Sequence, residues 1–518
     1  MPELSLRNHQ TRTNRLRLLP VYCRGRIVNW LGLNLRYIFI IGFILLVANL
    51  AFAQNDSLWF ITRGGQNADE SWGVDVDSQG NIYWGTHQTV PGPWSDVYLY
   101  KLSPNGSVIW QTRYGGYWNE QVYIVTVKEP YVYVGGSKWR GLSLDSIDMF
   151  IAAFNTSNGD SVWSYVWDQG YGYDEIDGLV VDSNAIYISG WTTGQNTQND
   201  IAVLKLSLNG QLIWSQTWGS SLWDEANGQI VVDNQNIYVA GRYNAPNALV
   251  GGDAVLVAFS KSNGAYQWHR TWGGSGLDDA LGMIGDVTSL YVVGITNSFG
   301  NGSQIFLLKY DHAGNLVWDT LWGGTGSEAA RTLAITQDGY ILVAGKTDSY
   351  GAGQNDIALV KFNNSGALVW YRIWGGTGMD ESHGITTGSS FAYIAGETNS
   401  YGAGNLDGIL IKVNGSTGQF PSAVYEEPTK PLCSNLIFDC PNPVRSNLLI
   451  QFSLSQKSHV TLKVFDILGQ EKATLCSGIL NAGDHSAAFD FKKLPDGIYF
   501  YLLKTEQFVQ TKKVILVK

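Results

Sequence analysis

Charged residues are scarce in this chain of 518 residues. Lys, Arg, Asp and Glu make up 15% of it, against about 25% in ordinary domains. The net charge is −10, and removing the first 53 residues, which hold seven Arg, one Glu and no Lys, makes the remainder −16. Nucleic-acid binding needs a basic surface. The sequence therefore predicts that nucleic acid is not a partner.

Cysteine and catalytic motifs are also rare. Of four Cys, Cys23 lies in the basic leader, Cys433 and Cys440 could form a disulfide, and Cys476 is left over. No C-x-x-C pair and no His/Cys spacing typical of a metal site occurs. Residues 54–418 also lack G-x-S-x-G, H-E-x-x-H and nucleotide-loop motifs. The sequence therefore predicts no cofactor, no metal and no catalytic residue.

Only one long apolar run is present, Ile38 to Leu50, after the Arg-rich leader. Ala51-Phe52-Ala53 follows it and is typical of a cleavage site. Residues 1–53 are therefore predicted to be a signal peptide. A transmembrane span needs ~20 residues, so this shorter run favours a cleaved signal. An uncleaved anchor is one alternative, and a true start further downstream is another. The mature chain is predicted to have no transmembrane span.

What the chain has in abundance is glycine, aromatic residues and internal repetition. A tryptophan recurs at intervals of 50 to 54 residues, and a second one usually follows four residues later. In one unit the β-rich runs are Arg331–Thr336, Tyr340–Gly345, Asp356–Phe362 and Ala367–Trp374. Four antiparallel strands per ~52 residues are typical of a propeller blade. The first tryptophans are Trp59, Trp110, Trp163, Trp214, Trp268, Trp318 and Trp370.

The number of units and the ends of the repeat predict how the ring closes. The strand Leu58–Arg63 precedes every complete unit, and the last unit lacks such a strand after Lys412. The first strand is therefore predicted to complete the last blade, which removes an exposed edge. The fold class is predicted to be all-β, with a seven-bladed β-propeller of four-stranded blades over residues 54–418. Its inner strands are predicted to begin near Gly73, Val122, Gly178, Gly228, Gly282, Thr332 and Gly384.

The repeat motif resembles a known family. It reads W-G-G-x-G-x-(D/E), then I-Y-V-A-G-x-T-x-S-x-G, then D-I-A-L-x-K, and is fullest in Gly323–Glu328, Tyr340–Gly353 and Asp356–Lys361. It is similar to the bacterial propeller repeats known as SBBP repeats, from about Leu58 to Gly418. The resemblance implies a secreted propeller and no single reaction.

The C-terminal part departs from this period. Residues 419–440 carry Pro421, Pro428 and Pro431 and are predicted to be a linker. Residues 441–518 alternate in hydrophobicity and are predicted to form a small β-sandwich. The motifs that characterise this tail are Pro441-Asn442-Pro443, Val464–Gly469, Gly483-Asp484-His485, Leu494–Phe500 and Thr511–Lys518.

This tail looks like the C-terminal sorting domain of the type IX secretion system. The resemblance implies the type IX machinery as a partner and export through the periplasm. The destination is then the outer cell surface or the extracellular space, and the tail is removed on release or attachment. A plain accessory sandwich is the alternative.

Loop lengths indicate which face of the propeller carries function. The connections between second and third strands are long and variable: Val90–Ser95, Ser137–Ile147, Trp191–Asn199 and Tyr243–Gly252. Binding residues are concentrated on such loops. Acidic residues recur on this face and either cap turns or attract a cation. They open the inner strands (Asp69, Glu120, Asp174, Asp224, Asp278, Glu328, Asp380) and precede the third strands (Asp96, Asp148, Asp200, Asp253, Asp356, Asp407).

Aromatic residues break the symmetry of this face in neighbouring blades. Tyr and Trp rings suit the apolar faces of sugars and also serve as anchors in protein interfaces. They are predicted to form one ligand-binding sector, and packing beneath the long loops is the alternative. The candidate binding residues are Trp94, Tyr117, Trp118, Trp139, Tyr171, Tyr173, Trp191, Trp223 and Tyr243.

These observations predict a secreted or cell-surface propeller with a non-catalytic binding or adhesion role. Its ligand is predicted to be a polysaccharide or a surface protein. A polysaccharide hydrolase or lyase is the first alternative, with His87 and His383 near Glu397, Asp69 and Asp380. A purely structural surface component is the second.

Overall fold

The computed structural model describes residues 58–89, 94–116, 118–141, 147–170, 172–194, 198–245, 251–421, 447–454, 457–481, 483–491, 494–505 and 509–516. The predicted signal peptide, residues 1–53, lies outside these ranges. So do Cys433, Cys440 and nearly all of the predicted linker. Within the described ranges, no helix has the length and apolarity needed to cross a membrane.

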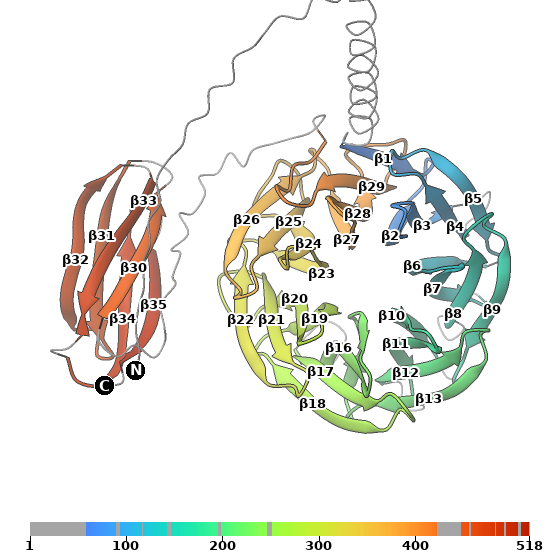
Figure 1. Ribbon diagram of the computed structural model, residues 1–518, viewed down its shortest axis with the longest axis horizontal. Helices are drawn as coiled ribbons and strands as arrows, with labels where there is room; N and C mark the ends of the chain where they lie inside the picture. Colours follow the sequence, from blue (N-terminus) through green and yellow to red (C-terminus); the bar gives the residue numbers. More distant parts are fainter. Residues whose placement is uncertain are drawn as a thin grey trace, which may run out of the picture. The chain divides into compact units, whose positions relative to one another are not determined.

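Residues 58–421 form seven antiparallel sheets arranged around a ring (Figure 1). The first strands line the axis, and the first strand of the fourth sheet is split in two. The inner strands are β2 (Glu70–Val76), β6 (Glu120–Lys128), β10 (Asp174–Val181), β14 (Trp223–Glu225) with β15 (Ile230–Val232), β19 (Asp278–Gly285), β23 (Glu328–Ile335) and β27 (Asp380–Thr387). The second strands are β3 (Ile82–Thr89), β7 (Tyr131–Trp139), β11 (Ala185–Thr193), β16 (Asn236–Ala245), β20 (Ser289–Thr296), β24 (Ile341–Thr347) and β28 (Phe391–Thr398).

The outer half of each sheet has the same regularity. The third strands are β4 (Ser95–Leu102), β8 (Ile147–Asn155), β12 (Asn199–Ser207), β17 (Asp253–Ser260), β21 (Gln304–Asp311), β25 (Asp356–Phe362) and β29 (Asp407–Asn414). The fourth strands are β5 (Val108–Tyr114), β9 (Ser161–Trp167), β13 (Leu212–Trp218), β18 (Tyr266–Trp272), β22 (Leu316–Trp322), β26 (Leu368–Trp374) and β1 (Trp59–Arg63). Third strands such as β25 are buried along their whole length, because neighbouring sheets cover both faces.

The ring closes through its N-terminal strand, as the sequence predicts. β1 pairs antiparallel with β29, from Trp59 opposite Lys412 to Arg63 opposite Gly408. The Phe60 ring packs against Trp374 and Tyr401, with both pairs of centroids 5.5 Å apart. The last sheet therefore combines the two ends of the propeller sequence and leaves β29 without an open edge.

The repeated tryptophans hold neighbouring blades together. Each first tryptophan lies against a glycine in the hairpin of the next blade, and several donate an Nε1–H bond to a carbonyl there, as Trp318 does to Asn364 at 3.1 Å. Gly366 has φ +82°, and a Cβ on it would lie 2.9 Å from the Trp318 ring. Glycine thus provides both the turn and the room for the ring. The pairs are Trp59–Gly106, Trp110–Gly159, Trp163–Gly210, Trp214–Gly264, Trp268–Gly314, Trp318–Gly366 and Trp370–Gly418.

The C-terminal residues form two sheets around a core of their own. One sheet pairs β30 (Asn447–Leu454) with β33 (Gly483–Asp490). The other has the order β32 (Glu471–Leu480), β31 (Ser458–Asp466), β34 (Gly497–Lys504) and β35 (Val509–Leu516). Phe452, Leu462 and Tyr501 come from both sheets and belong to one buried cluster. Two antiparallel sheets packed in this way make a small β-sandwich.

Candidate functional site: the channel mouth

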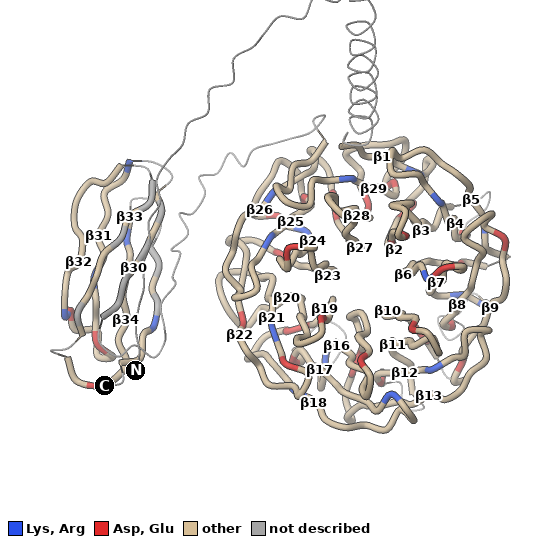
Figure 2. Tube along the Cα trace, in the orientation of Figure 1, with Lys and Arg blue, Asp and Glu red and all other residues tan. Residues whose placement is uncertain are grey.

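The acidic residues that open the inner strands cap the turns of the loop-rich face. Asp69 accepts hydrogen bonds from the backbone N–H of Gly65 and of Thr89, both at 2.6 Å. Asp380 accepts from the backbone N–H of Gly376 at 2.8 Å and from the hydroxyl of Ser400 at 2.7 Å. Figure 2 shows acidic residues (red) spread around the inner part of the ring. These bonds agree with the interpretation of the repeated carboxylates as caps.

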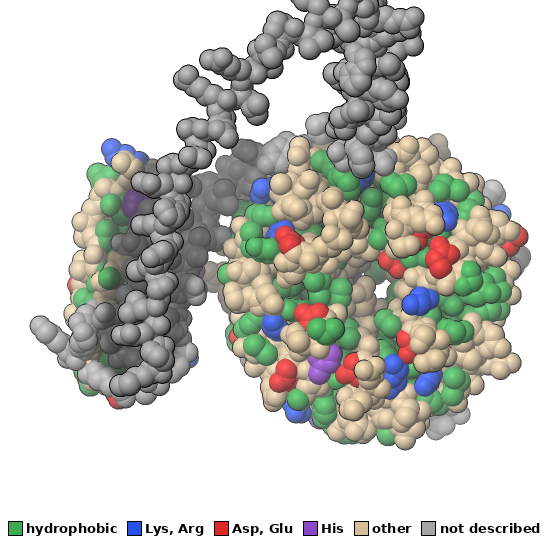
Figure 3. Space-filling view, viewed as in Figure 1, with side chains coloured by type: hydrophobic (Ala, Val, Ile, Leu, Met, Phe, Trp, Pro, Cys, Tyr) green, Lys and Arg blue, Asp and Glu red, His purple; other side chains and the backbone are tan. Residues whose placement is uncertain are grey.

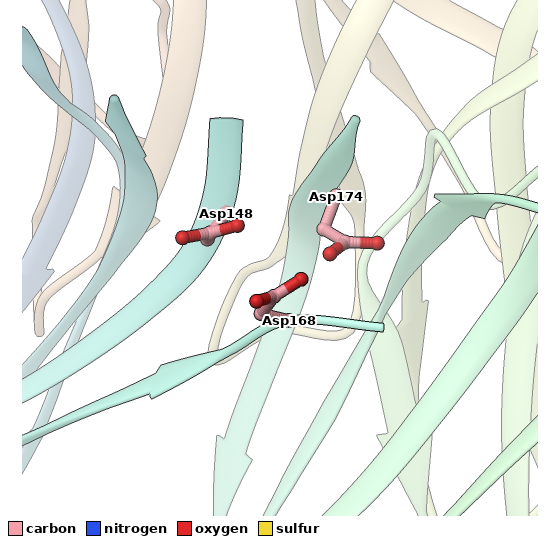
Figure 4. Close-up of side chains that lie close together, drawn as sticks. All are labelled: Asp148, Asp168 and Asp174. Atoms are coloured by element: carbon pink, nitrogen blue, oxygen red, sulfur yellow. The ribbon is translucent and has the colours of Figure 1, made fainter. Parts of the chain in front are cut away.

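One turn departs from this pattern and places three carboxylates together (Figure 4). Asp148, Asp168 and Asp174 each offer an oxygen atom, and the three atoms lie within 4.8 Å of one another. The other six units have glycine where this unit has Asp168. A Cβ on those glycines would stand 2.1–2.5 Å from a carboxylate oxygen. The six positions are Gly64, Gly115, Gly219, Gly273, Gly323 and Gly375.

Arg140 balances part of the charge of this cluster. Its Nη2 donates to Asp148 at 2.8 Å, and its Nη1 lies 3.0 Å from an oxygen of Asp168. Burial raises the pKa of Asp148 to about 6 although Arg140 lowers it, and burial likewise raises the pKa of Asp174 to about 6. The guanidinium supplies positive charge that a metal ion would otherwise bring. We therefore assign this cluster the role of joining the β7–β8 loop to the β9–β10 turn.

The structure places five of the predicted aromatic residues in ring contacts, while Trp139 ends β7 and Trp223 begins β14 without a ring contact to another predicted residue among the described ones. Tyr117 and Tyr171 lie outside the described residues, and the other seven are half-buried. Trp94 packs edge-on against Trp118, with centroids 5.1 Å apart. Tyr173 stacks on Trp191 at 4.8 Å and 10°. Another pair is formed by Tyr243 with Trp218, a residue outside the predicted set, at 5.2 Å and 26°.

A second set of side chains faces the axis of the ring, and we call it the channel ring. Its members are the third residues after the acidic caps. In every blade the residues directly before and after the member are buried, whereas the member itself is half-buried or, for Arg331, exposed. In six blades it stands at the β-bulge of its inner strand, and in the fourth it lies between β14 and β15. A bulge re-aims a side chain. The channel ring is Trp72, Tyr123, Asp177, Asn227, Leu281, Arg331 and His383.

The channel ring is aromatic on one side. The indole of Trp72 stacks on His383, with centroids 4.1 Å apart at 9°, and meets Tyr123 edge-on at 5.4 Å. The Arg331 guanidinium lies 5.4 Å from the centroid of the Trp72 ring. These residues come from the first, seventh, second and sixth blades. Their contacts therefore show that the side chains meet in the space around the axis, where Figure 3 shows the ring hollowed.

Two histidines named for the enzyme alternative lie on this aromatic side. His87 Nε2 is 3.5 Å from Glu70, which also accepts a 2.9 Å hydrogen bond from Trp72 Nε1. His383 Nε2 is 3.7 Å from Glu397, and both histidine side chains are 5% exposed. Burial alone would raise the pKa of Glu70, but the hydrogen bond and charge of His87 lower it to about 2. Asp69 and Asp380 are caps, as described above.

The opposite side of the channel is acidic. Arg242 Nη2 pairs with Glu225 at 2.5 Å, and Asn227 Nδ2 donates to both oxygens of Asp279 at 3.1 and 3.2 Å. Asp177 is different, because its Oδ2 is buried and has no hydrogen-bond partner among the described residues. The carboxylates in this region therefore differ in whether a cation or a hydrogen-bond donor of the protein lies beside them.

Glu175 and Asp177 form the poorly matched pair. Burial raises the pKa of Glu175 to about 7, with the charge of Glu225 adding to the effect and Arg331 opposing it. Burial and the charge of Glu175 raise the pKa of Asp177 well above its usual range. Two half-buried carboxylates that raise each other's pKa do not both ionise readily at neutral pH. The pair therefore binds a proton more readily than ordinary carboxylates do.

Tyr173 connects the predicted aromatic residues to this channel. Burial together with the charge of Glu175 raises the pKa of its phenol. Its ring stacks on Trp191. We call the combined surface the channel mouth. It comprises Trp72, Tyr123, Tyr173, Glu175, Asp177, Trp191, Arg331 and His383.

Sequence reasoning named Tyr173, Trp191 and His383 but missed the rest of the channel mouth. The missing signal was the channel-ring position itself, which holds a different amino acid in each of the seven units. The neighbouring positions in the repeat vary far less in chemical type. The varying position therefore gives the otherwise repeated ring an asymmetric lining.

Comparison with protein families identifies the C-terminal part. Residues 440–518 match the secretion system C-terminal sorting domain. The predicted type IX sorting tail is confirmed. Export by type IX secretion to the cell surface or the extracellular space follows from this match. Residues 184–212 and 336–368 match a β-propeller family described as a domain of unknown function, DUF5122, which confirms the propeller.

Individual proteins similar to this chain add little about activity. The regulatory protein FlaEY of Caulobacter vibrioides is 28% identical over 144 residues, and the match spans 24% of this chain and 15% of that protein. A protein of unknown function from Dyadobacter fermentans covers 68% of this chain and 98% of its own, at 10% identity and a TM-score of 0.37. The polysaccharide lyase Uly1 covers 68% and 90%, at 11% identity and a TM-score of 0.40. Similarity at this level carries no inference about function.

Proposed function

We propose that this protein is an exported, non-catalytic binding propeller that recognises a polysaccharide at the channel mouth. The observation that carries the proposal is the stacked pair of Tyr173 and Trp191 beside the channel carboxylates. Both rings are half-buried, so each has a covered part and an accessible part. The pair lies on the loop-rich face, with Tyr173 directly before β10 and Trp191 within β11.

The chemistry of the channel mouth suits a sugar ring. Flat aromatic surfaces bind the apolar C–H faces of sugars, and a few fixed polar groups orient the hydroxyl groups. Tyr173 and Trp191 provide such surfaces, while Glu175 and Asp177 provide oxygen atoms that accept hydrogen bonds. Because this pair binds a proton more readily than ordinary carboxylates do, it can also donate one. The mixture of donors and acceptors matches the mixture on a carbohydrate.

The test is the binding of the full chain to a panel of polysaccharides. We expect at least one to bind, and Trp191→Ala to weaken that binding about tenfold, which corresponds to about 1.4 kcal/mol. Trp318→Ala is the matched control, because this tryptophan contacts a hairpin of the next blade and no residue of the channel mouth. Equal binding by wild type and Trp191→Ala would contradict the proposal, as would the failure of wild type to bind any polysaccharide in the panel.

The hydrolase or lyase alternative is favoured by one specific observation. His87, Glu70, Trp72, His383 and Glu397 form a connected series at the axis. Analysis of the products in the same samples separates the two functions. Polysaccharide that stays intact after prolonged incubation supports binding alone. Shortened or unsaturated polysaccharide products support the hydrolase or lyase alternative.

A further inference from the structure

We propose that the end of the channel opposite the loop-rich face holds a second binding site, for a small organic cation with an apolar body such as an alkylammonium ion. This inference is independent of the polysaccharide proposed for the channel mouth. The site is a cavity of about 390 Å³, lined by the inner strands of all seven blades toward the ends that lead into the tight hairpins. Sites for small molecules are typically ~300–1,000 Å³.

One position of the inner strand divides the lining of this cavity into a polar and an apolar part. Through the strand register, the position faces a tyrosine of the second strand in six blades and Leu342 in the sixth blade. The seventh, first and second blades are neighbours in the ring, and they have Thr386, Asp75 and Thr126 there. The other four blades have apolar residues at this position: Val180, Val231, Ile284 and Ala334.

Asp75 is the only charged side chain among the residues that line the cavity. Its Oδ1 accepts hydrogen bonds from the backbone N–H of Val76 at 2.8 Å and from the hydroxyl of Thr386 at 3.3 Å. Its Oδ2 accepts from the backbone N–H of Val127 at 2.8 Å. A carboxylate has about four acceptor sites, so Oδ2 has room for one more donor.

The charge of Asp75 has no cation of the described residues beside it. Asp75 forms no ion pair among these residues, and Asp77 adds a like charge. Burial raises the pKa of Asp75 to about 6, although the bonds from Val127 and Val76 lower it. A carboxylate with this pKa is mostly ionised at pH 7.5. A negative charge in a largely apolar cavity attracts a ligand of opposite charge more strongly than it would in water.

Joining the blades does not by itself account for this carboxylate. The bonds from Val127 and Thr386 do connect the first blade to the second and the seventh. The other six blades, however, pack with Thr, Val, Ile or Ala at the same position. An acid is therefore not needed there to hold neighbouring blades together. Burying a charge without a partner disfavours folding, and a cationic ligand offsets that cost.

The division of the lining gives the ligand one orientation. An ammonium group offers three donors and one positive charge. It is expected to donate to Oδ2 of Asp75 and to the hydroxyl of Thr126, on the polar side of the cavity. The apolar body then lies against Val180, Val231 and Ile284 on the other side. A neutral molecule of the same length fills the cavity equally well but leaves the charge of Asp75 unmatched.

Two probes of equal length test the inference. Isothermal titration of the full chain at pH 7.5 compares hexylammonium with 1-hexanol. We expect hexylammonium to bind at least tenfold more tightly than 1-hexanol, and Asp75→Asn to abolish this preference. Asp279→Asn is the matched control, since Asp279 is another buried carboxylate whose pKa is raised to about 6 but does not line the cavity. It is expected to keep the preference.

A second variant tests the cavity without altering its carboxylate. Val180→Trp places a large ring in the cavity and is expected to abolish the binding of hexylammonium, while a thermal melt of each variant verifies that it is folded. If Asp75→Asn does not fold, Val180→Trp decides the question. Equal binding of both probes, failure of hexylammonium to bind, a preference that survives in folded Asp75→Asn, or unchanged binding by Val180→Trp would each overturn the inference. None of these outcomes affects the polysaccharide proposed for the channel mouth.

Discussion

Ending the chain after Asp439 is expected to trap the propeller in the periplasm. Residues 440–518 match the sorting domain, and their sandwich has a hydrophobic core of its own, so removing them removes the export signal and leaves the sheets of the ring intact. Antibody detection in periplasmic, surface and medium fractions measures the result. Wild type is expected at the surface or in the medium, and the truncated chain in neither.

The control for this experiment is Trp191→Ala, which alters the channel mouth and leaves the tail unchanged. It is expected to reach the same compartment as wild type in similar amount. Normal surface or medium levels of the truncated chain would show that the tail does not direct export. Loss of both proteins from all fractions would instead point to degradation, which a thermal melt of each purified chain would reveal.

Removing β1 is expected to open the ring. A chain that begins at Gly64 loses the five paired residues of β1 and the contacts of Phe60 with Trp374 and Tyr401. Each large apolar side chain that loses its burial costs about 1.5–3 kcal/mol. The total of about 5 kcal/mol corresponds to a fall in Tm of roughly 10 °C. Differential scanning calorimetry measures this fall.

A chain that begins at Leu58 retains β1 and serves as the comparison. It should melt at the same temperature as the full chain. The chain that begins at Gly64 also exposes the backbone edge of β29 and should associate with itself. Identical melting of the two truncated chains, with both monomeric, would show that β1 does not stabilise the ring.

The closure of the ring could be predicted from the sequence because it depends on the number and order of the Trp-bearing strands. Seven Trp-bearing strands occur, but the first precedes every complete unit, and the structure pairs that strand with β29. The caps could be anticipated in the same way, since Asp69 and Asp380 recur at a fixed place before a strand and bond the backbone there. Local features that repeat along the chain are accessible to this reasoning.

The channel mouth could not be assembled from the sequence in the same way. Trp72 and Arg331 lie far apart in the chain and approach each other only because the ring closes. The direction of Asp177 depends on a bulge that shifts the strand register by one residue. The sequence predicts one binding sector for the aromatic residues, and this stays a prediction. The structure adds the ring contacts that the sequence could not give, such as Tyr173 on Trp191.

Hydroxyl-radical footprinting locates the binding site most directly. The full chain is oxidised with and without a saturating polysaccharide from the binding panel, and mass spectrometry measures the oxidation of individual tryptophans. Binding at the channel mouth predicts that Trp191 and Trp72 become protected, while Trp110 and Trp318 on the outer strands react equally in both samples. Protection confined to the outer strands, with Trp191 and Trp72 unchanged, would contradict binding at the channel mouth.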